Sequence, residues 1–283
     1  MTDQTTPPAH SHGRGLIEAR YRDPDLADRL SGAGWNDTLD VLFAHRSVRH
    51  YLDRPLPPGM IELIVGAAQS APTTSNLQAW SVIAVRDTAR KARLADMSAR
   101  QRHIHEAPVL LVFVADLARL RGLTRETELD GAGLDYLESF VVAVADASFA
   151  AQNATVAAES LGLGCCYIGS MRNHPETVAS ELGLPDETVA LFGMTVGFPD
   201  PAFASDIKPR LPQDVILHEE QYTPPCADSI SRYNGKMRAF QAEQDMPVRD
   251  WSRLMAQRIG DRDALKGRHV LKDFLHAHGF GLK

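Results

Sequence analysis

The sequence is poor in the residues that mark several specialised protein classes. It holds three cysteines among 283 residues, and so low and odd a number fits a reducing compartment better than a disulfide framework. The longest apolar run, residues 109–115, is far shorter than the ~18 residues that a membrane-spanning helix needs. The N-terminus is polar and lacks the apolar core of a secretory signal. We therefore expect a cytoplasmic protein that does not insert into a membrane.

Neither sign of charge is in large excess. The chain has 30 Lys and Arg against 36 Asp and Glu, a formal net charge of −6, so its overall charge does not indicate a nucleic-acid partner. Positive charge is concentrated in residues 236–283, which hold ten Lys or Arg and six Asp or Glu. That stretch is either a basic surface for a phosphate-bearing ligand or a solvated helix face, and its composition does not decide between them.

Hydrophobic patterning predicts an α+β fold. Helical spacing of apolar residues predicts a helix over 60–68, and residues 134–161 predict a long helix, apolar on nearly every side and so buried in a core or an interface. Residues 119–133 show no clear period and are expected to form a loop. Few strand–helix–strand units are regular, which favours α+β over a doubly wound sheet. Short β-favouring runs predict strands at residues 80–85, 109–116, 165–168 and 188–198.

Residues 1–34 differ in composition from the rest of the chain. They contain scattered prolines, glycines and charges but few large apolar side chains, so they cannot bury much surface. We expect them to form a polar, partly disordered extension, in which Leu16, Ile17 and Tyr21 could still dock as a short helix. The folded domain is then expected to comprise residues 35–283.

Two basic motifs are candidates for binding a phosphate group. Residues 45–49 place an imidazole, a hydroxyl and two guanidinium groups within five positions, and forked guanidinium donors match phosphate oxygens well. In the proline-braced segment 206–212, Lys208 and Arg210 are two positions apart, so in an extended backbone both side chains point the same way. Each motif could equally be ordinary basic surface.

The other motifs carry weaker signals. Residues 72–78 hold several hydrogen-bonding side chains between a helix and a strand, which suits either a turn or a loop that contacts a planar ligand. The glycines of residues 162–170 do not form a dinucleotide-binding motif, because their spacing is not GxGxxG and they follow a helix. The histidine pairs at 103/105 and 276/278 lack a third ligand, so no metal site is expected.

Five segments, in this order, resemble a single family: the NADPH-dependent flavin reductases and oxygen-insensitive nitroreductases that bind FMN. The resemblance is carried by HRSVRHYLDRPLP (45–57), AAQSAPTTSNLQAWSVIAV (67–85), AQNATVAAESLGLGCCYIGSMRN (151–173), LFGMTVGFP (191–199) and DIKPRLP (206–212). It implies an intertwined homodimer of α+β protomers, each with a central mixed sheet flanked by helices, and FMN bound at the dimer interface. Residues 1–34 have no counterpart in the family pattern.

The resemblance also implies which residues contact the cofactor. Arg49 and Gln101 correspond to residues near the pyrimidine edge of the flavin, where a cation would stabilise negative charge on the reduced ring. The implied contacts with the phosphate and ribityl chain are His45, Arg46, Ser47, Lys208 and Arg210. Those implied along the ring are Thr73, Thr74, Ser75, Gln78, Tyr167, Ile168, Gly169 and Ser170.

Two further basic residues, Arg249 and Arg268, correspond to residues that face NADPH in the family. The basic loop of the NADPH-preferring subgroup is thinner here, because Arg249 is the only arginine in residues 242–252, so NADH is expected as an alternative to NADPH. Cys166 and Ser170 also depart from the family pattern, which usually has a small residue or glycine at the first position and often a glycine at the second.

The activity implied is two-step (ping-pong) hydride transfer, from NAD(P)H to FMN and then to a quinone, a nitroaromatic, a flavin or a similar acceptor. The cofactor carries the chemistry, so no catalytic side chain is expected. The alternatives are a flavin reductase that supplies reduced FMN to a partner oxygenase, and a non-redox flavin-binding sensor. A thiol-dependent enzyme would need Cys165 or Cys166 as a nucleophile, although both are better interpreted as buried structural thiols.

Overall fold

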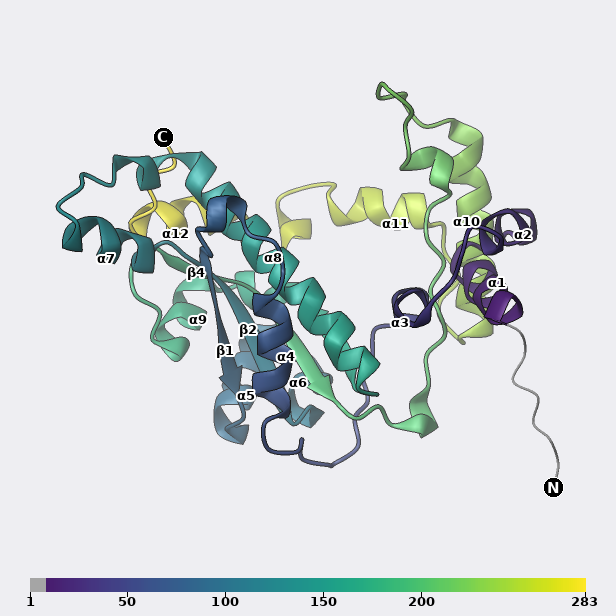
Figure 1. The fold of residues 1–283 in the computed structure, drawn as a ribbon, viewed down its shortest axis with the longest axis horizontal. Coiled ribbons are helices and arrows are strands. Elements are labelled where there is room, and N and C mark those ends of the chain that lie inside the picture. Colours follow the sequence, from purple (N-terminus) through teal and green to yellow (C-terminus); the bar gives the residue numbers. More distant parts are fainter. Residues whose placement is uncertain (1–8) are drawn as a thin grey trace. The chain divides into compact units, whose positions relative to one another are not determined.

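A computed structural model describes residues 9–283 of the chain (Figure 1). Contacts divide the chain into two compact units, each built from two separate stretches of sequence. The first unit comprises the chain up to Arg46 together with Ser205–Ala264, and the second comprises Ser47–Ala204 together with Leu265–Lys283. The division expected after residue 34 stays a prediction.

The second unit is built around a four-stranded sheet in the order β1-β2-β4-β3. Every pairing between these strands is antiparallel. We expected a mixed sheet, but its four strands are all antiparallel. Within the described residues, the parallel pairing is a single isolated bridge between Ser47 and Cys165. The strands match the predicted runs to within one residue: β1 (Trp80–Val85), β2 (Val109–Asp116), β3 (Gly164–Ile168) and β4 (Thr188–Gly197).

Strand β2 is buried on both faces, which explains its continuous apolar run. Val109, Leu111 and Phe113 pack into a core with α4 and α8. Leu110 and Val112 point the other way, into a core with α5, α6 and α9, because side chains alternate along a strand. The helices of this unit are α4 (Met60–Gln69), α5 (Thr88–Met97), α6 (Arg102–Glu106), α7 (Ala118–Glu126), α8 (Leu137–Ser160), α9 (Pro175–Leu182) and α12 (Leu271–Ala277).

The long apolar helix predicted over residues 134–161 is α8, which lies along the sheet (Figure 1). By length and composition α8 could cross a membrane, but 44% of its most apolar stretch is buried inside the fold. Small side chains allow it to approach the sheet closely: Ala143, Ala147, Ala150, Ala151, Ala154 and Ala158 are all buried. Leu137, Val141 and Phe149 remain 47–52% exposed, so this chain leaves a second apolar face of α8 uncovered.

The expected loop over residues 119–133 is wrong in its first half, because α7 begins at Ala118. Arg121, on this helix, donates from Nε to Glu187 Oε1 (2.9 Å) and from Nη2 to Asp135 Oδ1 (2.7 Å). Its side chain is 16% exposed. A partly buried arginine, paired with residues distant in the sequence, therefore occupies a position that the polar sequence suggested was solvated. For that reason the helical period was not recognised.

The first unit contains the described part of the expected extension. Asp23 caps α2 by accepting from Leu26 N (3.0 Å), and Ile17 and Leu26 are buried. The short helix expected around Ile17 is confirmed, whereas residues 1–8, to which the expectation of disorder also applies, lie outside the described residues. The helices of this unit are α1 (Ala9–Tyr21), α2 (Pro24–Ser31), α3 (Asp37–Ala44), α10 (Ala227–Glu243) and α11 (Trp251–Arg258).

Candidate functional site

The loop that precedes β1 is held by a buried carboxylate. Asp146, on α8, accepts a hydrogen bond from the backbone N–H of Thr74 at Oδ1 (2.9 Å) and another from that of Ala79 at Oδ2 (3.1 Å). Asp146 is 1% exposed, in a helix whose buried residues are otherwise almost all apolar. One carboxylate therefore fixes both ends of a loop that includes Ser75 and Gln78 of the expected flavin contacts.

The same loop turns so that its polar side chains face outward. Ser75, Asn76 and Gln78 have positive φ angles of 50°, 56° and 50°, which the tight turn between the anchored ends requires. The backbone N–H of Gln78 donates to Thr73 Oγ1 (3.2 Å), and its Nε2 donates to Asn76 Oδ1 (3.2 Å). The side chains of Thr74, Ser75 and Gln78 are exposed, so hydroxyl and amide groups are available to a planar ligand.

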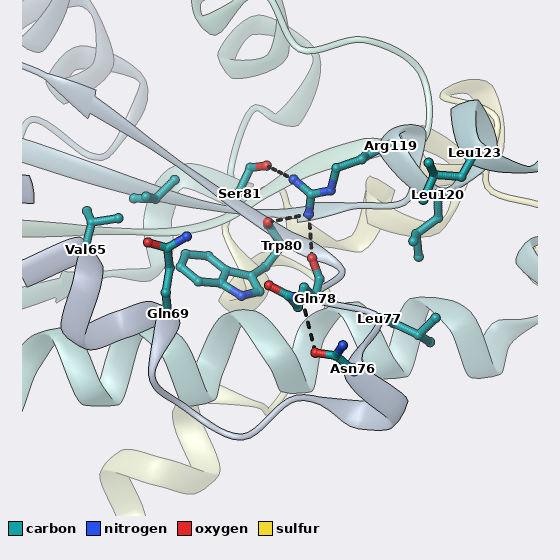
Figure 2. A pocket seen from close by; sticks show the side chains of 11 residues that line it. Val65, Gln69, Asn76, Leu77, Gln78, Trp80, Ser81, Arg119, Leu120 and Leu123 are labelled. Carbon is teal, nitrogen blue, oxygen red and sulfur yellow. Dashed lines mark hydrogen bonds between the residues drawn. The ribbon is translucent and has the colours of Figure 1, made fainter. Parts of the chain in front are cut away.

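A cavity of about 590 Å³ lies beside this loop (Figure 2). Arg119, from α7, donates from Nη2 to the carbonyl oxygens of Gln78 (2.5 Å) and Trp80 (2.9 Å). Its guanidinium is thus engaged in holding the loop against β1. Among the predicted cofactor contacts, all of which the structure describes, Gln78 alone lines the cavity. The lining residues are Val65, Gln69, Asn76, Leu77, Gln78, Trp80, Ser81, Val82, Arg119, Leu120 and Leu123.

The end of β3 brings together two residues that are far apart in sequence. Gln101 Nε2 donates to Ser170 Oγ (2.5 Å) and to the carbonyl oxygen of Ser98 (3.0 Å). Ser170 is buried, and its hydroxyl donates to the same carbonyl (3.1 Å). This network fixes the backbone at Gly169, next to Ile168 at the strand end. The serine that departs from the family pattern is therefore used to position Gln101.

Tyr167 presents its ring on the surface of β3. The side chain is 39% exposed, and its hydroxyl lies 3.0 Å from Thr155 Oγ1 on α8. Desolvation raises the pKa of Tyr167 to about 12, so the phenol is neutral at physiological pH. A partly exposed aromatic ring held at its hydroxyl end suits stacking against a planar ligand.

Residues 47–49 are fixed along β3 by backbone contacts. The N–H of Val48 donates to the carbonyl oxygen of Cys165 (2.9 Å), next to the Ser47–Cys165 bridge. A glycine is needed at position 164, because a Cβ there would lie 2.5 Å from the Val48 side chain. The side chain of Arg49 is exposed and forms no hydrogen bond or ion pair within residues 9–283. Its charge is therefore available to a ligand.

The two basic motifs expected at a phosphate meet in the first unit. Arg20 donates to the carbonyl oxygens of His45 (2.6 Å) and Lys208 (2.9 Å), so both motifs contact the same guanidinium. The side chains of Arg46, Lys208 and Arg210 are exposed. In the described part of the chain, neither Arg46 nor Arg210 has a side-chain hydrogen bond or an ion pair. The two unpaired guanidinium groups, with the ammonium of Lys208 nearby in the same motif, fit a phosphate dianion, which binds best to several cations.

The two residues expected at NADPH lie in different units. Arg249 belongs to the first unit and is exposed, and its backbone N–H donates to Gln241 Oε1 (2.7 Å). Arg268 belongs to the second unit, where its Nε donates to Asn173 Oδ1 (2.9 Å). That Arg249 and Arg268 bind NADPH together stays a prediction.

The vicinal thiols do not form a nucleophilic site. Cys165 and Cys166 are 1% and 4% exposed and enter different cores on opposite faces of β3. Burial raises the pKa of the Cys165 thiol far above its usual range, which keeps it protonated. The interpretation as buried thiols is confirmed.

Three residues that hold the candidate site are absent from the sequence-based prediction. Asp146 gave a signal, since it is an acidic residue in an otherwise apolar helix, but its partners are backbone groups 67 and 72 residues away. Arg119 and Arg20 gave none, because an arginine that binds carbonyl oxygens of a distant loop looks like any surface arginine in the sequence. Only the tertiary structure identifies them.

Family models match most of the chain. Residues 42–198 match the model of the nitroreductase family, and residues 208–283 match that of the nitroreductase family C-terminal domain. An oxygen-insensitive NADPH nitroreductase of Salmonella typhimurium is 33% identical over 248 residues, covering 87% of this chain and 99% of that protein. An FMN reductase (NADPH) of Bacillus subtilis is 36% identical over 251 residues, covering 87% and 98%.

A solved structure is similar over the same extent. The NADPH:FMN oxidoreductase of Vibrio harveyi, in a complex with NAD⁺, superposes with a TM-score of 0.78 at 31% identity. The match covers 88% of this chain and 100% of that one. The similarity in both sequence and fold therefore includes whole relatives, and this chain has additional residues.

The anchoring of the loop by Asp146 predicts a specific effect of its removal. Asp146→Ala leaves the buried N–H of Ala79 and the partly buried N–H of Thr74 without an acceptor, and a buried group left unpaired costs about 1–3 kcal/mol. We expect the free energy of unfolding in urea to fall by about 2–5 kcal/mol and amide hydrogen exchange at Thr74 and Ala79 to accelerate. Gln152→Ala, at an exposed position of the same helix, is the control. Unchanged exchange at both amides would show that the carboxylate does not hold the loop.

Proposed function

The chain belongs to the nitroreductase family and is an FMN-dependent NAD(P)H oxidoreductase, and we propose that it reduces quinones, nitroaromatics, flavins or similar acceptors in two successive half-reactions. The observation that supports this most directly is the meeting of the two basic motifs in the first unit. When bound, FMN supplies the redox chemistry that links NAD(P)H to the acceptor.

The phosphate of FMN is assigned to the first unit. Arg46, Lys208 and Arg210 would bind the phosphate oxygens, with His45 as a further donor. Hydrogen bonds between charged groups are worth about 1.5–3 kcal/mol each, so a few of them would hold the cofactor firmly. The family resemblance assigns Ser47 to the ribityl chain.

The family resemblance assigns a further set of residues to the flavin ring. Arg49 has an uncommitted guanidinium, which would favour negative charge on the ring and so assist its reduction. Gln101, held by Ser170, would offer a hydrogen bond to the ring edge. Tyr167–Gly169 and the loop Thr73–Gln78 would flank the ring and position it. No side chain has to act as an acid or base in this scheme.

NADPH is proposed as the usual electron donor, with NADH as an alternative. Both curated relatives described above are named for NADPH, and the similar structure contains NAD⁺. Arg249 and Arg268 would meet the negatively charged groups of the dinucleotide. The acceptor would then use the same surface of the cofactor once NADP⁺ has left.

A homodimer is proposed from the uncovered apolar face of α8. Leu137, Val141 and Phe149 are about half exposed in the single chain, and burying such side chains in a partner is favourable. The family resemblance supports the same arrangement. Cytoplasmic location is proposed from the sequence, as are small-molecule acceptors in place of nucleic acid or membrane.

The activity is tested by the visible spectrum of the pure protein. We expect flavin absorption that bleaches on anaerobic addition of NADPH and returns when a quinone or a nitroaromatic compound is added. Faster turnover of free FMN than of quinone would favour a flavin reductase that serves a partner oxygenase. Bound FMN that NADPH does not bleach would favour a sensor. Absence of bound flavin, together with background NADPH oxidation after FMN is added, would contradict the proposal.

The phosphate assignment predicts a loss of FMN affinity without a loss of folding. We expect Lys208→Ala and Arg210→Ala each to raise the Kd for FMN about 10- to 100-fold, since each removes a charged hydrogen bond worth about 1.5–3 kcal/mol. Both side chains are exposed, so the melting temperature of the apoprotein should change little. Flavin fluorescence quenching measures the Kd, and Arg253→Ala is a control at another exposed cation. Lower stability with unchanged FMN affinity would contradict the assignment.

The dimer proposal predicts the effect of a charge on α8. Phe149→Glu places a carboxylate on the uncovered apolar face and should shift the sedimenting species from a dimer towards the 31.1 kDa monomer. Gln152→Glu, exposed on the same helix, adds the same charge at a polar position and serves as the control. A wild-type protein that sediments as a monomer at every concentration would rule the dimer out.

A further inference from the structure

We propose that Arg20, a residue of the N-terminal extension, is a positioning residue for the FMN phosphate site. This inference rests on the proposed function, because it concerns the cations assigned to that phosphate. Arg20 does not touch the ligand in this proposal. It acts by holding the backbone from which His45, Arg46, Lys208 and Arg210 project.

The contacts of Arg20 join the two motifs directly. Its guanidinium donates from Nη1 to the carbonyl oxygen of Lys208 (2.9 Å) and from Nη2 to those of His45 (2.6 Å) and Phe43 (2.9 Å). The backbone carbonyl of Arg20 accepts from the N–H of Arg210 (2.9 Å). Both the side chain and the backbone of one residue therefore set the spacing between the motifs.

The guanidinium also improves the electrostatics of the site. Arg20 is 6% exposed, so its charge lies in a weakly screened environment. It turns three carbonyl oxygens towards itself, and these oxygens carry partial negative charge that would repel a phosphate. The buried guanidinium of Arg20 thus adds positive charge that favours the phosphate, together with the exposed cations that would bind it.

Arg20 is itself rigidly placed by the extension. Ile17, one turn earlier on α1, is 1% exposed. Arg22 forms an ion pair with Glu243 on α10, and Lys236 Nζ lies 3.4 Å from Asp23 Oδ2. The turn that follows α1, two residues after Arg20, is therefore attached to α10, which limits the movement of Arg20.

Arg20 lies outside the residues that the two family models match. The family model begins to match at residue 42, and the Bacillus subtilis FMN reductase is covered over 98% of its length by 87% of this chain. Arg20 precedes that match. The extension thus adds the hydrogen bonds of Arg20 to the two basic motifs, which the family models do match in part. We infer that these hydrogen bonds preorganise the phosphate site.

The test compares FMN with riboflavin, which has the same ring and lacks the phosphate. Both are titrated against the full-length apoprotein by fluorescence quenching, for the wild type, Arg20→Ala, Arg20→Lys and the control Arg14→Ala on the same helix. The melting temperature of each apoprotein is recorded. We expect Arg20→Ala to weaken FMN binding at least about tenfold and to leave riboflavin binding unchanged. Arg20→Lys should be intermediate, since an ammonium cannot bridge the same carbonyls in the same geometry. Arg14→Ala, which breaks pairs with Glu18 and Asp28 and none of the bonds of Arg20, should keep the preference for FMN.

Each outcome bears on a different claim. Equal losses of FMN and riboflavin affinity in Arg20→Ala, or no loss at all, would overturn the role of Arg20. If Arg20→Ala does not fold, Arg20→Lys decides: a reduced preference for FMN at an unchanged melting temperature supports the proposal, and a full preference overturns it. A wild-type protein that binds riboflavin as tightly as FMN would instead contradict the phosphate assignment on which the proposal rests.

Discussion

Burial of β2 between two layers of helices is the constraint on which the second unit depends. Its side chains alternate between a core with α4 and α8 and a core with α5, α6 and α9. Strand β4, its neighbour, is almost as fully buried, so the middle of the sheet has no room for polar chemistry. Two of the candidate ligand-binding segments lie at strand ends: the loop before β1 and Gly169–Ser170 after β3.

Single charged side chains shape the irregular segments. Loops cannot satisfy their backbone groups by a regular ladder, and those that are buried need other partners. Asp146 supplies acceptors for the loop before β1, Arg119 supplies donors for the same loop, and Arg20 supplies donors for the two basic motifs. In each case a side chain from one element binds main-chain atoms of another, which fixes geometry without depending on the identity of the loop residues.

Sequence patterns predicted those helices and strands whose hydrophobic pattern is visible among neighbouring residues. The four strands and α8 were found because alternation and apolar runs extend over neighbouring residues, and the cationic motifs because their members are adjacent. The helix at Ala118–Glu126 was missed because Arg121 is buried by ion pairs with Glu187 and Asp135. The same limit applies to the candidate site. Exposed groups such as Arg49 and Arg210 can be identified from a motif, whereas Arg20 is recognised only through carbonyl oxygens at positions 43, 45 and 208.

The discontinuity of the first unit has a consequence for synthesis. Its helices α1 and α2 leave the ribosome first, but the segment that completes their core begins at Ser205, after the whole of Ser47–Ala204. At roughly 5–20 residues per second, the early helices wait roughly 8–30 s before their partner emerges. During that interval Ile17 and Leu26 have no long-range packing partner, and closing so long a loop is slow. The N-terminal helices of the nascent chain therefore stay incompletely packed until the second stretch of their unit has been synthesised.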